Sequence, residues 1–337
     1  MKKTLLVFIP LVLIAFSCEK ALFEDQPANS PYSNFEELWT TIDEKYAFFD
    51  YKNIDWDSIR NAYRPRIRRG MSRRQLFDVC SSMLFELKDG HVNLISTFDV
   101  SRYWAYYLDY PVNFDYDLIE RNYLGDDYEI TGPFRNTWID STGYVYYGSF
   151  GDSFSHSQVD YLLAKYQRAN GLIIDVRNNG GGYTKLVQRL AGHFVTEKLF
   201  YARNYFQNGP GHQDFAPPEE KYIEPSDGIK WTKPVVLLTN RKCFSATNTF
   251  VLAMTQLENV RQFGDHTGGG GGIPISAELP NGWTYRFSAS KSISPDGFNI
   301  ENGIPPDEKI GMSDTDIQQG RDTILEYALE TLRKKRN

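Results

Sequence analysis

VVLLTNRKCFSATNTFVLAM occupies residues 235–254 and changes character in its middle. The first five residues form an apolar, β-branched run that is typical of a strand buried in a sheet. A polar break at residues 240–242 follows, and the apolar residues after Ser245 continue as a helix. We therefore predict a buried strand, a turn, and a helix that begins just beyond Ser245.

Ser245 lies where the predicted helix begins, and this position has two interpretations. Helix N-termini present unpaired N–H groups and a partial positive charge, which favour an alkoxide or an oxyanion. Serine is also among the commonest helix N-caps, and on this stretch alone the cap is the favoured interpretation. CFSAT is not the G-x-S-x-G turn of the α/β-hydrolases. A nucleophilic serine would need a base from elsewhere in the chain.

A second strand–turn–helix unit precedes the first. GLIIDV (171–176) is a short apolar run, RNNGGG (177–182) follows it, and YTKLVQRLAGHF (183–194) has helical spacing. Two such units predict an α/β core over residues 144–310 with a parallel sheet. Gly180 and Gly181 allow backbone N–H groups to approach a ligand closely, as an oxyanion hole requires. A bland glycine turn remains the alternative, and no Gly-Lys-Ser/Thr follows that would indicate a phosphate loop.

The rest of the chain is arranged around this core. Apolar residues at three- and four-residue steps predict a small helical subdomain over residues 34–91, with Ser72 as an N-cap. Strand-like runs, among them YPVNFDY (110–116), predict a β-rich segment over residues 92–150, a polar excursion covers 201–233, and a C-terminal helix is expected over 314–335. The whole of 92–333 is expected to form the core domain.

His91 ends the helical subdomain in the segment LKDGHVNL. Histidine is the side chain best suited to act as a base near neutral pH. A single histidine in such a position is more often structural, so His91 is a candidate only in combination with the other segments.

The composition of the chain limits the classes of binding partner that it can have. The chain of 337 residues has a net charge of −6 and no useful basic run before its end, which argues against nucleic acid. Cys80 and Cys243 lie among apolar residues and are expected to be buried free thiols. No Cys/His spacing indicates a metal, and nothing indicates a cofactor.

The N-terminal sequence predicts that the protein is exported. Residues 1–18 have two lysines, an apolar run and Ser17-Cys18, as in a bacterial lipoprotein signal in which Cys18 is lipidated. An ordinary cleaved signal is the alternative. Residues 19–33 would tether the fold to the cell envelope, with the outer membrane expected because Glu19 follows the cysteine.

Four segments taken in order resemble one family: LKDGHVNL, GLIIDVRNNGGG, VVLLTNRKCFSATNTF, and GDHTGGGGG followed by GFNIENGIPPD. They resemble the C-terminal processing (tail-specific) serine proteases, including the tricorn-core-protease branch. The resemblance implies a crotonase/ClpP-like α/β superhelix preceded by helices, without a PDZ domain here, and endoproteolysis of proteins or peptides. It also implies Ser245 as nucleophile and N–H groups of Ala246, Gly180 and Gly181 as the oxyanion hole.

Two departures from the family pattern bear on which residue acts as the general base. The position of the tail-specific lysine is Gly270, so a serine–lysine dyad is not supported. The tricorn-like branch implies His91 as base and Glu301 as the group that orients it, although a solvated carboxylate is the alternative for Glu301. The helper serine of that branch is replaced by Gly90.

The favoured hypothesis is an envelope-anchored serine endopeptidase whose partners are protein or peptide substrates and, through the lipid anchor only, a membrane. The rival hypothesis is a catalytically inactive peptide- or lipid-binding module on the same fold.

Overall fold

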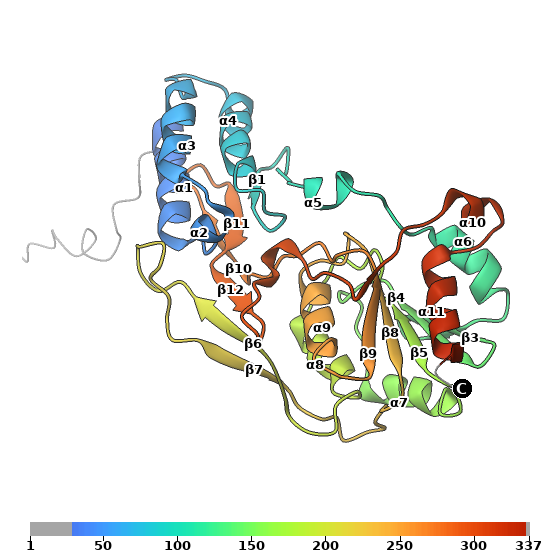
Figure 1. Cartoon of the computed structure of the whole chain (residues 1–337). Helices are drawn as coiled ribbons and strands as arrows, with labels where there is room; N and C mark the ends of the chain where they lie inside the picture. The colour runs from blue at the N-terminus through green and yellow to red at the C-terminus, as the bar shows by residue number, and fades with distance from the viewer. Residues whose placement is uncertain (1–28, 335–337) are drawn as a thin grey trace, which may run out of the picture.

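The structure is a computed structural model that describes residues 29–334; the predicted signal, Cys18 and most of the predicted tether lie outside this range. A seven-stranded sheet forms the centre of the molecule (Figure 1). Its strand order is β13-β9-β8-β5-β4-β3-β2, and β4, β5, β8, β9 and β13 run parallel. The strands are β2 (Glu129–Thr131), β3 (Phe134–Ile139), β4 (Thr142–Tyr147), β5 (Leu172–Asp175), β8 (Val235–Thr239), β9 (Val260–Gly264) and β13 (Glu308–Lys309). The predicted α/β core with a parallel sheet is confirmed.

Helices cover both faces of this sheet, which explains why β4, β5 and β8 are buried along their whole length. One face packs against α7 (His156–Lys165), α8 (Thr184–Ala191) and α9 (Ala246–Met254). The other face packs against α11 (Thr323–Lys334) and the segment containing α6 (Tyr116–Ile119) and the π-helix η2 (Glu120–Leu124). Among the described residues, no helix has the length and apolar character that a membrane crossing requires.

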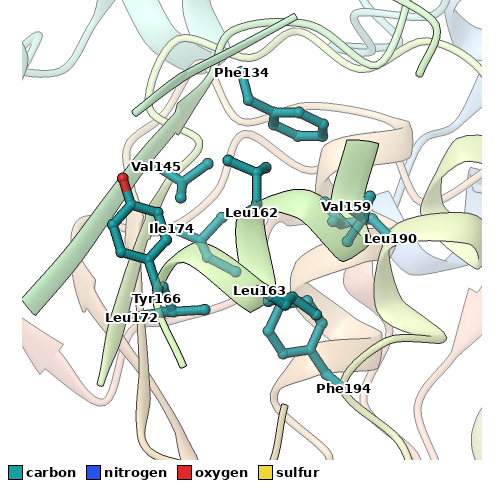
Figure 2. A pocket seen from close by; sticks show the side chains of 10 residues that line it. All are labelled: Phe134, Val145, Val159, Leu162, Leu163, Tyr166, Leu172, Ile174, Leu190 and Phe194. Carbon is teal, nitrogen blue, oxygen red and sulfur yellow. The ribbon is translucent and has the colours of Figure 1, made fainter. Parts of the chain in front are cut away.

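The core under α7 contains a small apolar cavity of about 20 Å³ (Figure 2). Side chains such as Val159 and Leu163 of α7 and Leu190 of α8 line it. A cavity of this size holds about one water, and a water needs polar partners that this lining does not present. We therefore assign it to core packing rather than to ligand binding.

The N-terminal helices form a second layer beside the main sheet (Figure 1). Their apolar faces pack onto a three-stranded sheet of order β1-β11-β10, so a late hairpin of the sequence completes the core of the helical subdomain. Ser72 caps α4 in a capping box, as predicted. The elements are α1 (Pro31–Lys45), α2 (Phe49–Lys52), α3 (Trp56–Tyr63), η1 (Arg64–Arg66), α4 (Arg73–Phe85), β1 (Asn93–Ile95), β10 (Pro274–Glu278) and β11 (Thr284–Ser288).

The polar excursion over 201–233 contains a hairpin. Strand β6 (Leu199–Phe206) pairs with β7 (Glu219–Ile223) on one side and with β12 (Ser290–Ile293) on the other, in a third sheet of order β12-β6-β7. This hairpin lies below the helical subdomain in Figure 1 and forms one wall of the pocket described below.

Two predicted elements differ in the structure. The predicted strand over 110–116 is wrong: α5 (Ala105–Leu108) precedes it, Asp115 caps α6, and Phe114 stacks on Tyr146 of the main sheet. The aromatic alternation there reflects packing against the sheet and not membership of it. The predicted helix over 314–335 is divided into α10 (Asp314–Gln318) and α11, because Gly320 adopts a left-handed φ of 72°.

Candidate active site

Ser245 occupies a strained turn between β8 and α9. Its backbone has φ 58° and ψ −119°, which a non-glycine residue rarely adopts. Such strain costs about 1–3 kcal/mol and recurs at functional sites, including nucleophile turns. Ser245 holds the N-cap position of α9, yet its side chain makes no capping hydrogen bond. The simple N-cap interpretation therefore does not account for this serine.

The Ser245 pocket, as we call it here, is a cavity of about 570 Å³. This volume is within the range of sites that bind small ligands or peptide segments. Its walls come from the β6–β7 hairpin, the start of α8, the glycine run Gly270–Gly272 and strand β11. Ser245 and Ala246 lie on its lining.

The glycine turn lies directly against the Ser245 turn. A β-carbon at Gly181 would lie 2.9 Å from Cβ of Ser245 and 2.9 Å from the Ala246 nitrogen. Asn179 shapes this turn: its Oδ1 accepts hydrogen bonds from the N–H of Gly181 at 3.0 Å and from the hydroxyl of Thr247 at 2.6 Å. Among the described residues, the N–H groups of Gly180 and Ala246 donate to no acceptor, so both are available to an oxyanion.

His91 is buried beside the residue that precedes Ser245. Its side chain packs on the ring of Phe244, with ring centroids 4.7 Å apart. Burial lowers the pKa of His91 to about 4, partly offset by the charge of Asp89, so the imidazole is neutral at physiological pH. Neither Nδ1 nor Nε2 has a hydrogen-bond partner among the described residues. A buried neutral imidazole with a free lone pair can accept a proton.

Glu301 is buried in the 3₁₀ helix η3 (Ile300–Asn302), so the solvated alternative for this carboxylate does not hold. Its Oε2 accepts the Gly271 N–H at 2.9 Å, and its Oε1 forms an ion pair with Nζ of Lys52 at 2.8 Å. Burial and the nearby charge of Asp89 raise the pKa of Glu301 to about 7, against the opposing effect of Lys52. A carboxylate in this environment ionises close to neutral pH.

No local sequence pattern indicated Lys52, the residue that pairs with Glu301. Lys52 lies at the end of α2 and donates to the carbonyls of Leu87 and Lys88 as well as to Glu301. Asp89 lies 3.9 Å from Nζ of Lys52, accepts the hydroxyl of Tyr46 at 3.0 Å and accepts the backbone N–H of His91 at 2.7 Å. These buried charges join the helical subdomain to the segments that carry His91 and Glu301.

The ring of Phe244 lies against both positions that depart from the family pattern, Gly90 in place of a serine and Gly270 in place of a lysine. The same ring stacks on Tyr106 with centroids 4.5 Å apart. A β-carbon at Gly90 would lie 2.8 Å from Tyr106 and 2.9 Å from Phe244, and one at Gly270 would lie 2.6 Å from Cζ of Phe244. Gly270 also has a φ of 75°. A serine at 90 and a lysine at 270 are therefore both sterically excluded while this ring is in place.

Arg177 of the RNNGGG segment supports the fold and lies outside the pocket. Its guanidinium is fully buried between the carboxylates of Asp175, at 2.6 Å, and Asp322, at 2.8 Å. It also lies over the ring of Phe114. The predicted buried thiols Cys80 and Cys243 are both present as free cysteines.

The structure gathers the predicted site residues into one region without joining them by side-chain hydrogen bonds. The Ser245 N–H donates to the Gly269 carbonyl, and the Gly270 N–H donates to the Glu301 carbonyl, so the glycine run links the two segments. His91 adjoins this region through Phe244. Within residues 29–334, no group of three or more His, Cys, Asp or Glu side chains could hold a metal ion.

Two family models match parts of the chain. The family model of Peptidase family S41 matches residues 141–310, and that of the tricorn protease C1 domain matches residues 27–85. The carboxy-terminal processing protease CtpB of Bacillus subtilis is 26% identical over 171 residues, which are 49% of this chain and 33% of that protein. The matched region thus spans about a third of the length of this curated relative.

Solved structures share the whole fold. A protein from Parabacteroides merdae ATCC 43184, named as a candidate peptidase, is 46% identical with a TM-score of 0.87; the match covers 90% of this chain and 96% of that one. Mature CPAF has a TM-score of 0.68 over 90% of this chain and 96% of its own, at 11% identity, which shows a common fold alone. The profile match over half of the sequence and the close structural relative agree, and the chain belongs to peptidase family S41.

Proposed function

We propose that the chain is a serine endopeptidase, anchored at the cell envelope, that hydrolyses peptide bonds of proteins or peptides through Ser245, His91 and Glu301. The observation that carries this proposal is the Ser245 turn: a strained serine, not used as a cap, that lines a cavity of about 570 Å³. Membership of family S41 supports the same reaction class.

In the proposed reaction, Ser245 Oγ attacks the scissile carbonyl while His91 takes its proton. Glu301 orients the imidazole and stabilises the imidazolium that forms. The N–H groups of Ala246 and Gly180 bind the oxyanion, and losing one such donor typically costs about 3 kcal/mol in the barrier. Gly181 was predicted to contribute a third donor, but its N–H is already bonded to Asn179 Oδ1. His91 then returns its proton to the leaving amine, and water hydrolyses the acyl-enzyme by the same route.

The relay requires side-chain movement on substrate binding. His91 makes no hydrogen bond to Ser245 or Glu301, and Glu301 is paired with Lys52. Catalytic hydrogen bonds are often long or misaligned before substrate binds and shorten in the Michaelis complex. We propose that an occupied pocket brings the imidazole and the Ser245 hydroxyl into contact.

A fluorophosphonate probe tests the nucleophile. We expect covalent labelling of the wild-type protein and none of Ser245→Ala, with Ser157→Ala, on the surface helix α7, as a matched control that keeps the label. Circular dichroism verifies that the variants are folded. A folded wild-type protein that takes no label, or a Ser245→Ala variant that still does, would contradict the assignment.

Two further variants test the relay. His91→Ala should abolish peptide hydrolysis and leave the fold intact, and full activity in this variant would exclude His91 as base. Glu301→Gln should lower kcat much more than it raises KM, because an orienting group acts mainly in the transition state. Equal changes in both parameters would argue for a structural role.

A second candidate function is a catalytically inactive peptide- or lipid-binding module. The ion pair between Glu301 and Lys52, together with the unpartnered imidazole of His91, favours it. A pocket that binds peptides without ever labelling at Ser245 would identify this alternative.

The envelope location rests on the sequence of residues 1–18. We propose lipidation of Cys18 and anchoring in the outer membrane. Metabolic labelling with a palmitate analogue tests this: the label should appear in the membrane fraction and disappear in Cys18→Ala. A soluble, unlabelled wild-type protein would refute the anchor.

A further inference from the structure

The Ser245 pocket has a marked charge asymmetry. Its lining includes three cationic side chains, Lys185, Lys221 and Arg286, and no aspartate or glutamate among the described residues. The chain as a whole carries a net charge of −6. A cation-lined cavity in an acidic protein focuses a positive potential and attracts anionic ligands.

Arg286 is placed in this pocket by strand alternation. Its neighbours Tyr285 and Phe287 on β11 are buried in the core of the helical subdomain. Successive side chains of a strand point to opposite faces, so Arg286 faces away from that core and lines the pocket. Besides burial, the charge of Arg286 contributes to the lowered pKa of His91.

Arg286 lacks a partner of its own. Its guanidinium forms no hydrogen bond or ion pair with any residue that the structure describes, although the side chain is half-buried; its backbone pairs within the sheet. Burial lowers the pKa of its guanidinium, against the opposing effect of the negative charge of Asp89, which is not hydrogen-bonded to it. The pocket's Lys221 pairs with Glu219, and the fully buried Arg177 has two carboxylate partners. A guanidinium that is partly withdrawn from water without a hydrogen-bonded partner is unfavourable, unless a ligand supplies one.

A carboxylate is the ligand group that fits. The guanidinium presents five N–H donors in a planar fork that matches a carboxylate in bidentate geometry. A peptide carries carboxylates at its C-terminus and on aspartate and glutamate side chains. Either source, bound in the same cavity as Ser245, would fix the register of the peptide relative to the nucleophile.

We propose that Arg286 is a specificity-determining residue that binds a carboxylate of the peptide held in the Ser245 pocket. This inference rests on the proposed function, because it names the peptides that the site selects. Lys185 and Lys221 add to the positive potential of the same cavity.

Peptide binding to the Ser245→Ala variant of the full chain tests the inference without requiring turnover. The probes are three fluorescent pools of degenerate hexapeptides: neutral with an amidated C-terminus, neutral with a free C-terminus, and amidated with one glutamate. We expect at least one carboxylate pool to bind about tenfold or more tightly than the neutral amidated pool, as a charge-assisted bidentate contact implies. The pool that gains affinity identifies the source of the carboxylate.

Substitutions on this background connect the preference to Arg286. The ratio to compare is the dissociation constant of the neutral amidated pool divided by that of the preferred carboxylate pool. Arg286→Gln should bring this ratio close to one, and Arg286→Lys should give an intermediate ratio. Arg69→Gln, at an exposed arginine of the helical subdomain, is the matched control and should keep the full ratio. Equal binding of the three pools, including no measurable binding, or a ratio unchanged by Arg286→Gln, would overturn the inference.

Fluorophosphonate labelling separates this inference from the proposed function. A protein that is labelled at Ser245 but shows no carboxylate preference would retain the peptidase assignment and lose the role of Arg286. A protein that prefers carboxylates through Arg286 but takes no label would lose the peptidase assignment alone.

Discussion

Replacement of Gly270 by alanine tests whether the Phe244 ring closes the position that a lysine base would occupy. Two effects add at this site. An L-residue at the φ of 75° costs about 1–2 kcal/mol. The new methyl group would lie 2.6–2.9 Å from three atoms of the Phe244 ring, and overpacking of this kind typically costs about 1–3 kcal/mol. We therefore expect Gly270→Ala to lower the free energy of unfolding by about 2–5 kcal/mol.

The chain offers a matched control. Gly297 has a similar φ of 91°, but a β-carbon there would meet no atom within 4 Å. Gly297→Ala should thus show only the conformational cost of about 1–2 kcal/mol. Equilibrium unfolding in urea, followed by tryptophan fluorescence and circular dichroism, measures both variants.

A double variant isolates the contact with the ring. Phe244→Leu shortens the side chain that Gly270→Ala would strike, so the two substitutions together should be less destabilising than their sum by about 1 kcal/mol or more. If Gly270→Ala destabilises no more than Gly297→Ala and the double variant is additive, Phe244 is not what excludes a larger residue at this position.

Four other expectations follow from the buried charges. Arg177→Met leaves two buried carboxylates without their cation and should lower the free energy of unfolding by about 3–5 kcal/mol in urea titrations; a loss under 1 kcal/mol would contradict this. Lys52→Met should reduce kcat and shift the pH at which activity rises to higher values, because Glu301 loses the cation that favours its ionised form; an unchanged pH profile would argue against the pairing. Because the pKa of Glu301 is raised to about 7, the folded state keeps a proton between about pH 4.5 and 7 that the unfolded state releases, so the wild-type protein loses stability as pH rises through this range. The free energy of unfolding of Glu301→Gln, measured relative to wild type, should therefore increase by about 1–3 kcal/mol between pH 5 and pH 8. A pH-independent difference would contradict this. In the same range activity should rise through about pH 7 with Glu301, while His91, whose pKa is about 4, stays neutral throughout.

The sequence predicted those parts of the site that depend on local pattern. The apolar run before Ser245 and the helical spacing after it predict a strand–turn–helix unit, because burial and periodicity are encoded in adjacent residues. The same reasoning failed over residues 110–116, where aromatic residues pack on the sheet from a short helix. Alternation alone does not distinguish a strand from a segment that covers one.

The roles of His91 and Glu301 were implied by resemblance, and they stay predictions. The structure places both residues in the region of Ser245 and buries both. It also adds contacts that no local pattern indicated, such as the pairing of Glu301 with Lys52 from α2. Nothing in the local sequence distinguishes Lys52 from a solvent-exposed lysine at the end of a short helix, because its burial depends on tertiary packing.

By itself, the sequence determined the parallel α/β core, the layer of N-terminal helices and the serine at a helix start, because each follows from the spacing of apolar residues along a short stretch. Only the tertiary structure decided the environment of the site: the unusual backbone of Ser245, the ring of Phe244 against His91, and the unpartnered Arg286 in the same pocket. Those properties depend on distances between side chains that are remote in sequence, and folding of the whole chain sets these distances.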